Sequence, residues 1–205
     1  MKVLTEVRRE AIVEAASKLF QEFGYEGASM NELANRLQGS KATLYRYFPS
    51  KEALFDAVVR ASSTSHLSKA VADLQANTEK DVLLVPSLQN FGETMLEVMT
   101  DSANALAVYR MVVAEAGRSE VGELFYKAGP GECVAALSNL LRKAMDRGEL
   151  RAAHPDVMAA YFLGLVSAEV EPRLYQRDPP PLSLQQIQEM VGRAVDMFLL
   201  GAAPR

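Results

Sequence analysis

The sequence predicts an all-α protein, and three observations support this class. Apolar residues recur at the three- and four-residue spacing of amphipathic helices, whereas runs of strict two-residue alternation are scarce. Serine caps open several of these stretches, and glycine or proline separates them. Hydrophobic residues make up 49% and charged residues 23% of the 205 residues, which is typical of a globular chain with a buried core.

The first helix is expected from Thr5 to about Phe23. Gly24 follows it as a C-terminal cap, because glycine adopts the left-handed conformation without a steric penalty. One face of this helix carries the apolar residues expected to be buried, namely Ile12, Ala15, Ala16, Leu19, Phe20 and Phe23.

Two short helices joined by a tight turn are expected within residues 29–48. Residues 29–32 read Ser-Met-Asn-Glu, a capping-box pattern in which the serine caps the helix and the glutamate reaches back. Gly39 and Ser40 make the turn, and Ser40 caps the second short helix, which ends near Phe48.

The rest of the chain is predicted to form longer amphipathic helices. Ser50 can cap the first of them, and Ser183 with Gln186 forms another capping-box pattern before the last. We therefore place an N-terminal domain of three helices at residues 1–50 and a C-terminal helical domain at residues 51–205. The helices expected in the second domain span residues 51–76, 86–100, 102–117, 120–128, 131–147, 156–175 and 184–200.

Composition excludes several classes of protein. No stretch of 18 apolar residues is present, and charges interrupt the N-terminal residues where a signal peptide needs an apolar core. A single cysteine, Cys133, cannot form an intrachain disulfide or a structural zinc cluster, and we expect it to be buried. The two histidines have no partner at metal-ligand spacing. We expect a cytoplasmic protein without metal, cofactor or membrane partner.

The positive charge is local, although the net charge is −4. Residues 1–60 hold nine Lys/Arg against eight Asp/Glu, whereas residues 61–205 hold thirteen against eighteen. Within residues 36–60 the balance is five against two. The cations therefore gather around the two short helices, where an acidic polymer can be bound despite the overall charge.

The two short helices have the pattern of a helix-turn-helix, in which the second helix enters the major groove of DNA. Leu44 and Phe48 are one turn apart and are expected to face the core. Lys51 begins the next helix, where charge and helix dipole together can hold a phosphate. The residues expected on the DNA side of the second helix are Ser40, Lys41, Ala42, Thr43, Tyr45, Arg46 and Tyr47.

Residues 28–55, ASMNELANRLQGSKATLYRYFPSKEALF, resemble the DNA-binding signature of TetR/AcrR-type transcriptional regulators. Residues 11–29 resemble the first helix and the Gly-Tyr corner of that family, and residues 114–137 resemble one of its ligand-domain types. One departure is present, because residues 38–40 read Gln-Gly-Ser where the family usually has Gly-Val-Ser.

The resemblance implies roles for individual residues. It places Ser29 against the DNA backbone and puts Ala42 and Arg46 near base edges. The residues that it implies as phosphate contacts are Lys41, Thr43, Tyr45, Tyr47 and Lys51.

Beyond the short helices, adaptable apolar side chains suggest an effector cavity, although each of them could instead be plain core. The resemblance favours the cavity. Candidate apolar lining residues are Phe91, Met95, Met99, Tyr109, Phe125, Tyr161 and Phe162, and the polar candidates are His66, Arg110 and Glu169.

Two features of the last helices suggest an interface between copies, although packing within one chain explains either feature alone. The resemblance implies that these helices pair across a twofold axis as a four-helix bundle. The small-residue ridge consists of Ala160, Gly164 and Ala168, and the apolar stripe of the last helix consists of Ile187, Val191, Ala194 and Phe198.

These observations together favour a homodimeric, ligand-responsive regulator that binds DNA. Repression, relieved by a small apolar or amphipathic effector, is the mode that the resemblance implies. The alternatives are an activator of the same family and a helical small-molecule-binding protein with no role on DNA. No catalytic constellation was found in the sequence, so an enzyme is not expected.

Overall fold

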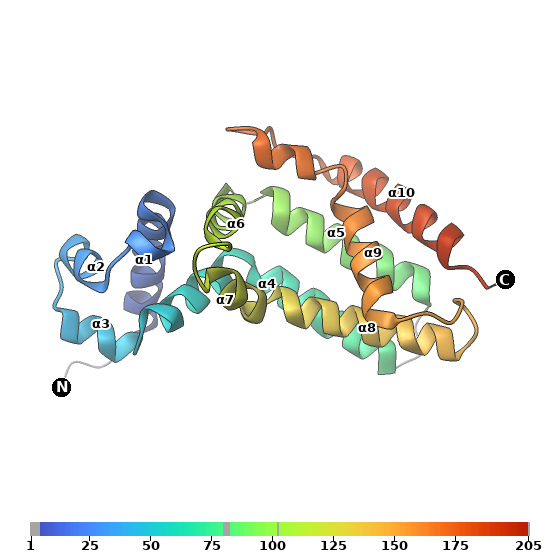
Figure 1. Ribbon diagram of the computed structural model, residues 1–205, viewed down its shortest axis with the longest axis horizontal. Coiled ribbons are helices and arrows are strands. Elements are labelled where there is room, and N and C mark those ends of the chain that lie inside the picture. Colours follow the sequence, from blue (N-terminus) through green and yellow to red (C-terminus); the bar gives the residue numbers. More distant parts are fainter. Residues whose placement is uncertain (1–4, 80–82, 102, 205) are drawn as a thin grey trace. The chain divides into compact units, whose positions relative to one another are not determined.

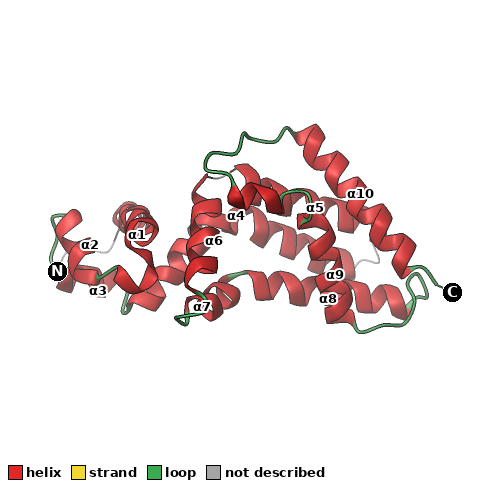
Figure 2. Cartoon of the chain, turned by 45° about the horizontal axis from the view of Figure 1, so that its top comes forward, coloured by secondary structure: helices red, strands yellow, loops and turns green. Residues whose placement is uncertain are grey.

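The computed structural model describes the backbone of residues 5–79, 83–101 and 103–204, and their side chains except at 62–69, 77–79, 101, 103 and 104. Every regular element in those ranges is a helix, which confirms the all-α class (Figure 2). The elements, labelled in Figure 1, are α1 (Glu6–Gly27), α2 (Met30–Arg36), α3 (Lys41–Tyr47), α4 (Lys51–Glu79), α5 (Leu84–Asp101), α6 (Ala103–Glu115), α7 (Val121–Ala128), α8 (Pro130–Asp146), α9 (Pro155–Ser167), the 3-10 helix η1 (Glu171–Tyr175) and α10 (Leu184–Ala202).

Serine caps begin the helices where the sequence predicts them. The Ser40 hydroxyl accepts a hydrogen bond from the backbone N–H of Thr43 at 3.1 Å. Ser183 and Gln186 form a complete capping box at the start of α10. At the other end of a helix, Gly24 has a φ of 72° and interrupts α1, as expected of a left-handed cap.

Two expectations about the helices need correction. The helix expected over residues 156–175 is broken, because α9 ends at Ser167 and only the short η1 follows. Pro172 accounts for the break, since its ring has no N–H and conflicts with the carbonyl four residues earlier. Phe23, expected to be buried, is 51% exposed and lies beneath the Arg36 guanidinium, 5.3 Å from its ring centroid.

The chain divides into two compact units. The first unit comprises Met1–Thr64 and Ala103–Gly129, and the second comprises Ser65–Ser102 and Pro130–Arg205. The first unit includes α6 and α7 because α6 packs on α1 and α7 packs on α6. The boundary predicted at residue 50 does not coincide with the limits of these two units, and the division by function that it expresses stays a prediction.

Each unit has its own apolar core. In the first unit, three aromatic rings join α1 to α4: Phe20 lies 5.8 Å from Tyr25, and Phe55 lies 5.5 and 5.1 Å from these two rings. In the second unit, α10 packs on α5 and α9, and α8 packs on α9. Phe162 of α9 and Phe198 of α10 meet edge to face there at 5.3 Å.

None of the helices in the described part of the chain combines the length and the hydropathy that a bilayer span requires.

Candidate nucleic-acid interface

Helices α2 and α3 form the predicted helix-turn-helix, and their buried side chains attach it to the first unit. Leu33 and Ala34 of α2 are at most 5% exposed, and so are Leu44 of α3 and Phe48, which follows α3. The expectation that Leu44 and Phe48 face the core is therefore confirmed. Because these four side chains point inward, the opposite face of α3 is left to solvent.

The turn between α2 and α3 differs in detail from the expectation. The N–H of Gly39 donates to the Ala34 carbonyl at 3.0 Å, and the N–H of Gln38 donates to the Asn35 carbonyl at 3.1 Å. This pair of bonds is a Schellman arrangement. Gln38, rather than a glycine, is the left-handed residue, with a φ of 48°.

The outward face of α3 is cationic and polar. Lys41, Ala42, Tyr45 and Arg46 are exposed, and the Lys41 ammonium lies 5.8 Å from the centroid of the Tyr45 ring. Thr43 is half-buried. This face therefore presents short and long hydrogen-bonding side chains together with two positive charges, a combination suited to phosphates and to base edges.

Tyr47, at the end of α3, is half-buried and held by α1. Its hydroxyl oxygen accepts a hydrogen bond from the backbone N–H of Thr5 at 3.1 Å. A tyrosine hydroxyl that accepts one bond keeps its own hydrogen for another acceptor. The predicted phosphate contact of Tyr47 is compatible with this geometry.

Lys51 lies in a different environment from the one expected. Its ammonium donates to the carbonyls of Tyr25, Glu26 and Ala28 at 2.8, 3.5 and 3.3 Å, and it lies 4.4 Å from the centroid of the Tyr25 ring. An ammonium has three hydrogens to donate. This geometry favours a structural role for Lys51 over the expected phosphate contact.

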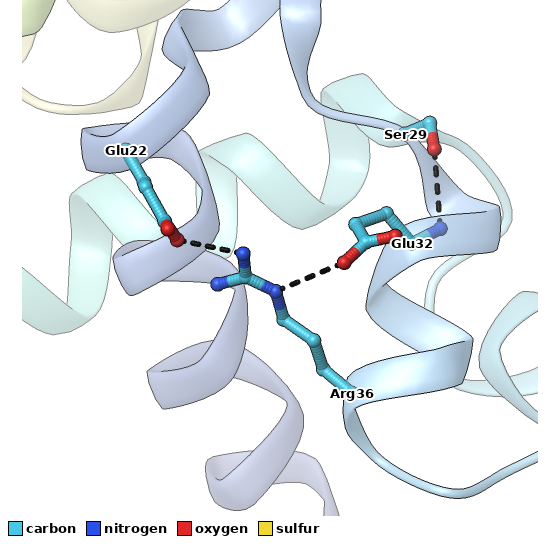
Figure 3. A network of polar contacts seen from close by, with 4 residues as sticks. All are labelled: Glu22, Ser29, Glu32 and Arg36. Atoms are coloured by element: carbon cyan, nitrogen blue, oxygen red, sulfur yellow. Dashed lines mark hydrogen bonds and ion pairs between the residues drawn. The ribbon is translucent and has the colours of Figure 1, made fainter.

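Arg36 connects α2 to α1 through a network of carboxylates (Figure 3). Its Nη2 lies 2.6 Å from a carboxylate oxygen of Glu22, and its Nε donates to Glu32 at 3.3 Å. The Ser29 hydroxyl accepts from the Glu32 N–H at 3.1 Å, which confirms Ser29 as a cap. The Glu32 carboxylate binds Arg36 instead of reaching back, so the expected capping box is only half formed.

The cations of residues 36–60 lie in different environments. Among the five cations of residues 36–60, Arg36 faces two carboxylates and Arg60 binds Asp56. Lys51 binds backbone carbonyls. On α3, the side chains of Lys41 and Arg46 are exposed.

The Gly-Tyr corner is held by a carboxylate from α6. Both oxygens of Glu115 accept from the Tyr25 N–H at 2.9 Å, and one also accepts from the Glu26 N–H at 3.2 Å. A Cβ on Gly24 would lie 1.8 Å from a Glu115 oxygen. Glycine is therefore favoured at this corner for two reasons, because a Cβ would displace the Glu115 carboxylate and would hold an unfavourable left-handed φ.

Four candidate cavity residues come together in the second unit. Phe91 and Phe162 are fully buried in its apolar cluster, and Met95 and Met99 pack against that cluster half-buried. Such an environment fits either a core or the wall of a cavity. The proposal that they contact an effector stays a prediction.

The other candidate cavity residues are not all beside these four. Tyr109 and Phe125 belong to the first unit, where their rings are 5.9 Å apart and Arg110 is half-buried on the same helix as Tyr109. His66 lies on α4, in the stretch whose side chains are outside the described residues.

Tyr161 and Glu169 are surface residues. Tyr161 is 60% exposed although Phe162 is buried, because successive helical residues point about 100° apart. Glu169 accepts from Arg193 of α10 at 2.7 and 2.9 Å, and this arginine lowers the pKa of the Glu169 carboxyl. Both residues were expected in a cavity, and the structure corrects this.

The two predicted interface features have different environments. Ala160, Gly164 and Ala168 of the small-residue ridge are exposed, so their role between copies stays a prediction. The α10 stripe is buried within the chain, because α10 turns this face toward α5 and α9. The residues to which this correction applies are Ile187, Val191, Ala194 and Phe198.

Sequence reasoning missed Arg8, which contacts the turn between α2 and α3, and Glu115, which contacts the Gly-Tyr corner. Glu115 is 90 residues from Tyr25, and no local pattern connects them. The one available signal was Gly24, because a left-handed corner leaves N–H groups that need an acceptor.

The buried face of α2 and α3, the Schellman turn and the cationic outward face of α3 together define a helix-turn-helix protein that binds DNA. Residues 12–58 match the family described as bacterial regulatory proteins of the tetR family. Residues 86–201 match the C-terminal domain of AefR-like transcriptional repressors. The chain belongs to the TetR family of transcriptional regulators, whose members bind operator DNA and small-molecule effectors.

Relatives of known sequence or structure agree with this assignment. YfiR, an HTH-type transcriptional regulator of Bacillus subtilis (strain 168), is 25% identical over 170 residues, which are 82% of this chain and 80% of YfiR. The structure of the flavonoid-responsive regulator FrrA matches with a TM-score of 0.72 at 29% identity, over 98% of this chain and 100% of FrrA. AibR, in complex with isovaleryl coenzyme A and operator DNA, matches with a TM-score of 0.60 at 26% identity, over 91% of this chain and 97% of AibR.

Proposed function

We propose that this chain is a homodimeric repressor that leaves a palindromic operator when an apolar or amphipathic small molecule binds its C-terminal helices. The observation that carries the proposal is the outward face of α3, where exposed Lys41 and Arg46 stand beside short polar side chains. Repression is favoured because the C-terminal match is to a domain of transcriptional repressors. An activator of the same family is the alternative.

The proposed contacts follow the geometry of α2 and α3. Ala42 and Arg46 are assigned to base edges, and Ser29 is assigned to the DNA backbone at the start of α2. Residues assigned to phosphates or to the adjoining backbone are Ser40, Lys41, Thr43, Tyr45 and Tyr47.

We assign the contact between copies to the exposed ridge of α9 and its C-cap, where Ala160, Gly164 and Ala168 allow a second helix to approach closely. Exposed Val157 and Tyr161 flank this ridge at 43% and 60%. A twofold dimer places two recognition helices in successive major grooves, about 34–36 Å apart. A palindromic operator follows from this symmetry.

An effector that favours a dimer with another spacing of the recognition helices releases DNA by population shift. The half-buried Met95 and Met99 beside an apolar cluster support an apolar or amphipathic guest. FrrA is described as flavonoid-responsive and AibR is bound to isovaleryl coenzyme A, and both ligands are partly apolar. We propose action in the cytoplasm, where operator DNA lies, and without catalysis.

The salt dependence of DNA binding tests the proposal. The wild-type protein is used to select duplexes from a random pool, and affinity for the selected duplex is measured from low to high salt. We expect affinity to fall steeply with salt, because phosphate contacts release counterions. Lys41→Ala should reduce the slope by about one unit. Lys18→Ala is the matched control, since Lys18 pairs with Glu14 on the exposed side of α1.

A protein that selects no duplex, or binds DNA without salt dependence, would instead be a helical small-molecule-binding protein. The effector is tested separately with a panel of hydrophobic and charged compounds, scored for thermal stabilisation and for release of the selected duplex. Release by charged polar compounds alone would contradict an apolar effector.

A further inference from the structure

The first turn of α1 contacts both ends of the recognition helix α3. The Thr5 N–H donates to the Tyr47 hydroxyl at 3.1 Å, and the Arg9 guanidinium carbon lies 5.1 Å from the ring centroid of Phe48, which follows α3. These two contacts hold the C-terminal end of α3. Arg8 makes the contact at the other end.

Arg8 lies directly against the turn that precedes α3. Its Nη2 donates to the Leu37 carbonyl at 3.3 Å, and a Cβ on Gly39 would lie 3.3 Å from the same nitrogen. A Cβ at position 39 would therefore press against the half-buried guanidinium, and a larger side chain would displace it. The space beside Gly39 is thus bordered by a side chain of α1.

The position of this turn decides where α3 begins. Gln38 holds a left-handed φ of 48°, which is unfavourable for a residue with a Cβ. This strain favours relaxation of the turn unless another group holds it. The Arg8 guanidinium can do so, because a hydrogen bond from a charged donor is stronger than a neutral one. Ser40 caps α3 two residues after Gln38, so any shift of the turn moves Lys41 and Ala42.

We propose that Arg8 is a positioning residue, which fixes the α2–α3 turn from α1 and thereby sets the specificity of α3 for its operator. The part of this inference that concerns operator specificity rests on the proposed DNA-binding function, whereas the part that concerns the turn does not. This role differs from a phosphate contact, because the guanidinium contacts Leu37 and Gly39 of the protein rather than DNA.

A set of three variants tests this role: Arg8→Ala, Gly39→Val and the double variant. Arg8→Ala removes the support of the turn, and Gly39→Val alone conflicts with the guanidinium. The double variant puts the valine into the space that the arginine leaves. The measurement is the affinity for the duplex selected by the wild-type protein, divided by the affinity for a scrambled duplex of equal length.

We expect Arg8→Ala to lower this ratio about tenfold, as for the loss of a hydrogen bond from a charged donor, with the salt slope unchanged. The double variant should recover only part of the ratio, because the valine packs against the turn but donates no hydrogen bond to the Leu37 carbonyl. A salt slope that falls by about one unit in Arg8→Ala would identify a direct phosphate contact and overturn the proposal. Lys18→Ala, which removes the same charge from α1, should change neither quantity.

Hydrogen exchange separates this inference from the proposed function. The N–H groups of Gln38 and Gly39 are bonded to carbonyls of α2, so their exchange reports on the turn without DNA. We expect their exchange to accelerate about tenfold in Arg8→Ala, for the same lost hydrogen bond, and to slow again only in part in the double variant. Unchanged exchange in Arg8→Ala overturns the positioning role even if DNA is bound, whereas a protein that selects no duplex contradicts only the proposed function.

Discussion

At the scale of single residues, the corner between α1 and α2 has the tightest requirements. Glu115 supplies a carboxylate to two backbone N–H groups, and such charge-assisted bonds are stronger than neutral ones. Gly24 makes room for that carboxylate and adopts a φ of 72°. Each of the two residues therefore depends on the other.

Gly24→Ala should lower the free energy of unfolding by about 2–4 kcal/mol, as left-handed strain and the weakened carboxylate bonds add. Denaturant titration followed by circular dichroism measures the change. In a Glu115→Ala background the same substitution should cost only about 1–2 kcal/mol, the left-handed strain alone. Gly148→Ala is a second control, because Gly148 has a φ of 75° and no atom near its Cβ position. Equal costs for Gly24→Ala in both backgrounds would exclude the Glu115 contact as the cause.

Cys133 should be unreactive in the folded protein. Burial, followed by the charge of Glu132, raises the pKa of the Cys133 thiol from 9.0 to about 11. A disulfide reagent at pH 8 should therefore react far more slowly with the native protein than with protein in guanidinium.

The same shift makes a pH-dependent contribution to stability. Because the pKa is higher in the folded state, this contribution is fully present below pH 9.0 and is lost as the pH rises toward about 11. The denaturation midpoint of the wild type should fall more between pH 8 and pH 10 than that of Cys133→Ala. Identical decreases would show that the thiol does not contribute.

At the scale of elements, the start of α4 and the end of α1 are joined by Lys51. The ammonium binds carbonyls of residues 25, 26 and 28, while Glu115 of α6 binds the N–H groups of residues 25 and 26. The cation of α4 thus binds backbone carbonyls of this corner, and the carboxylate of α6 binds its backbone N–H groups. Donors and acceptors of the corner therefore both have partners.

Lys51→Ala should lower the free energy of unfolding by about 1.5–3 kcal/mol, because bonds from a charged donor are lost. Thermal or denaturant melts measure this. The salt slope of DNA binding should stay unchanged relative to the wild type. A slope reduced by about one unit, with stability unaffected, would restore the phosphate contact expected from the sequence.

At the scale of the whole molecule, the proposed dimer depends on which faces of α9 and α10 are free. The stripe of α10 is used within the chain, whereas the ridge of α9 is exposed. Gly164 lies in the middle of that ridge, and a Cβ on it would meet no atom of its own chain within 4 Å.

Gly164→Leu should therefore leave the fold intact and weaken the dimer, because the larger side chain conflicts only with a partner helix. Sedimentation at low micromolar concentration measures the shift toward monomer, and operator affinity should fall with it. Gly92→Ala is the opposite control: its Cβ would lie 2.8 Å from Val191 of α10, so it should lower stability instead. An intact Gly164→Leu dimer would place the interface elsewhere.

Most of the helices, the serine caps and the helix-turn-helix could be predicted from the sequence, although the helix expected over residues 156–175 is broken. Ser40 and Ser183 cap helices through bonds that span three residues, and Gly24 interrupts α1 through its own backbone freedom. These interactions are local, so they can be predicted from the order of residues alone. The buried positions of Leu44 and Phe48 follow from helical periodicity for the same reason.

The partner of each apolar helix face and of each charged side chain depends on the tertiary structure. The α10 stripe was visible in the sequence, but burial of apolar surface has no directional preference, so α5 and α9 could satisfy it as well as a second copy. Lys51 binds carbonyls of α1, and Glu115 binds N–H groups 90 residues away. A charge accepts any partner of suitable geometry, and that geometry exists only once distant segments have packed.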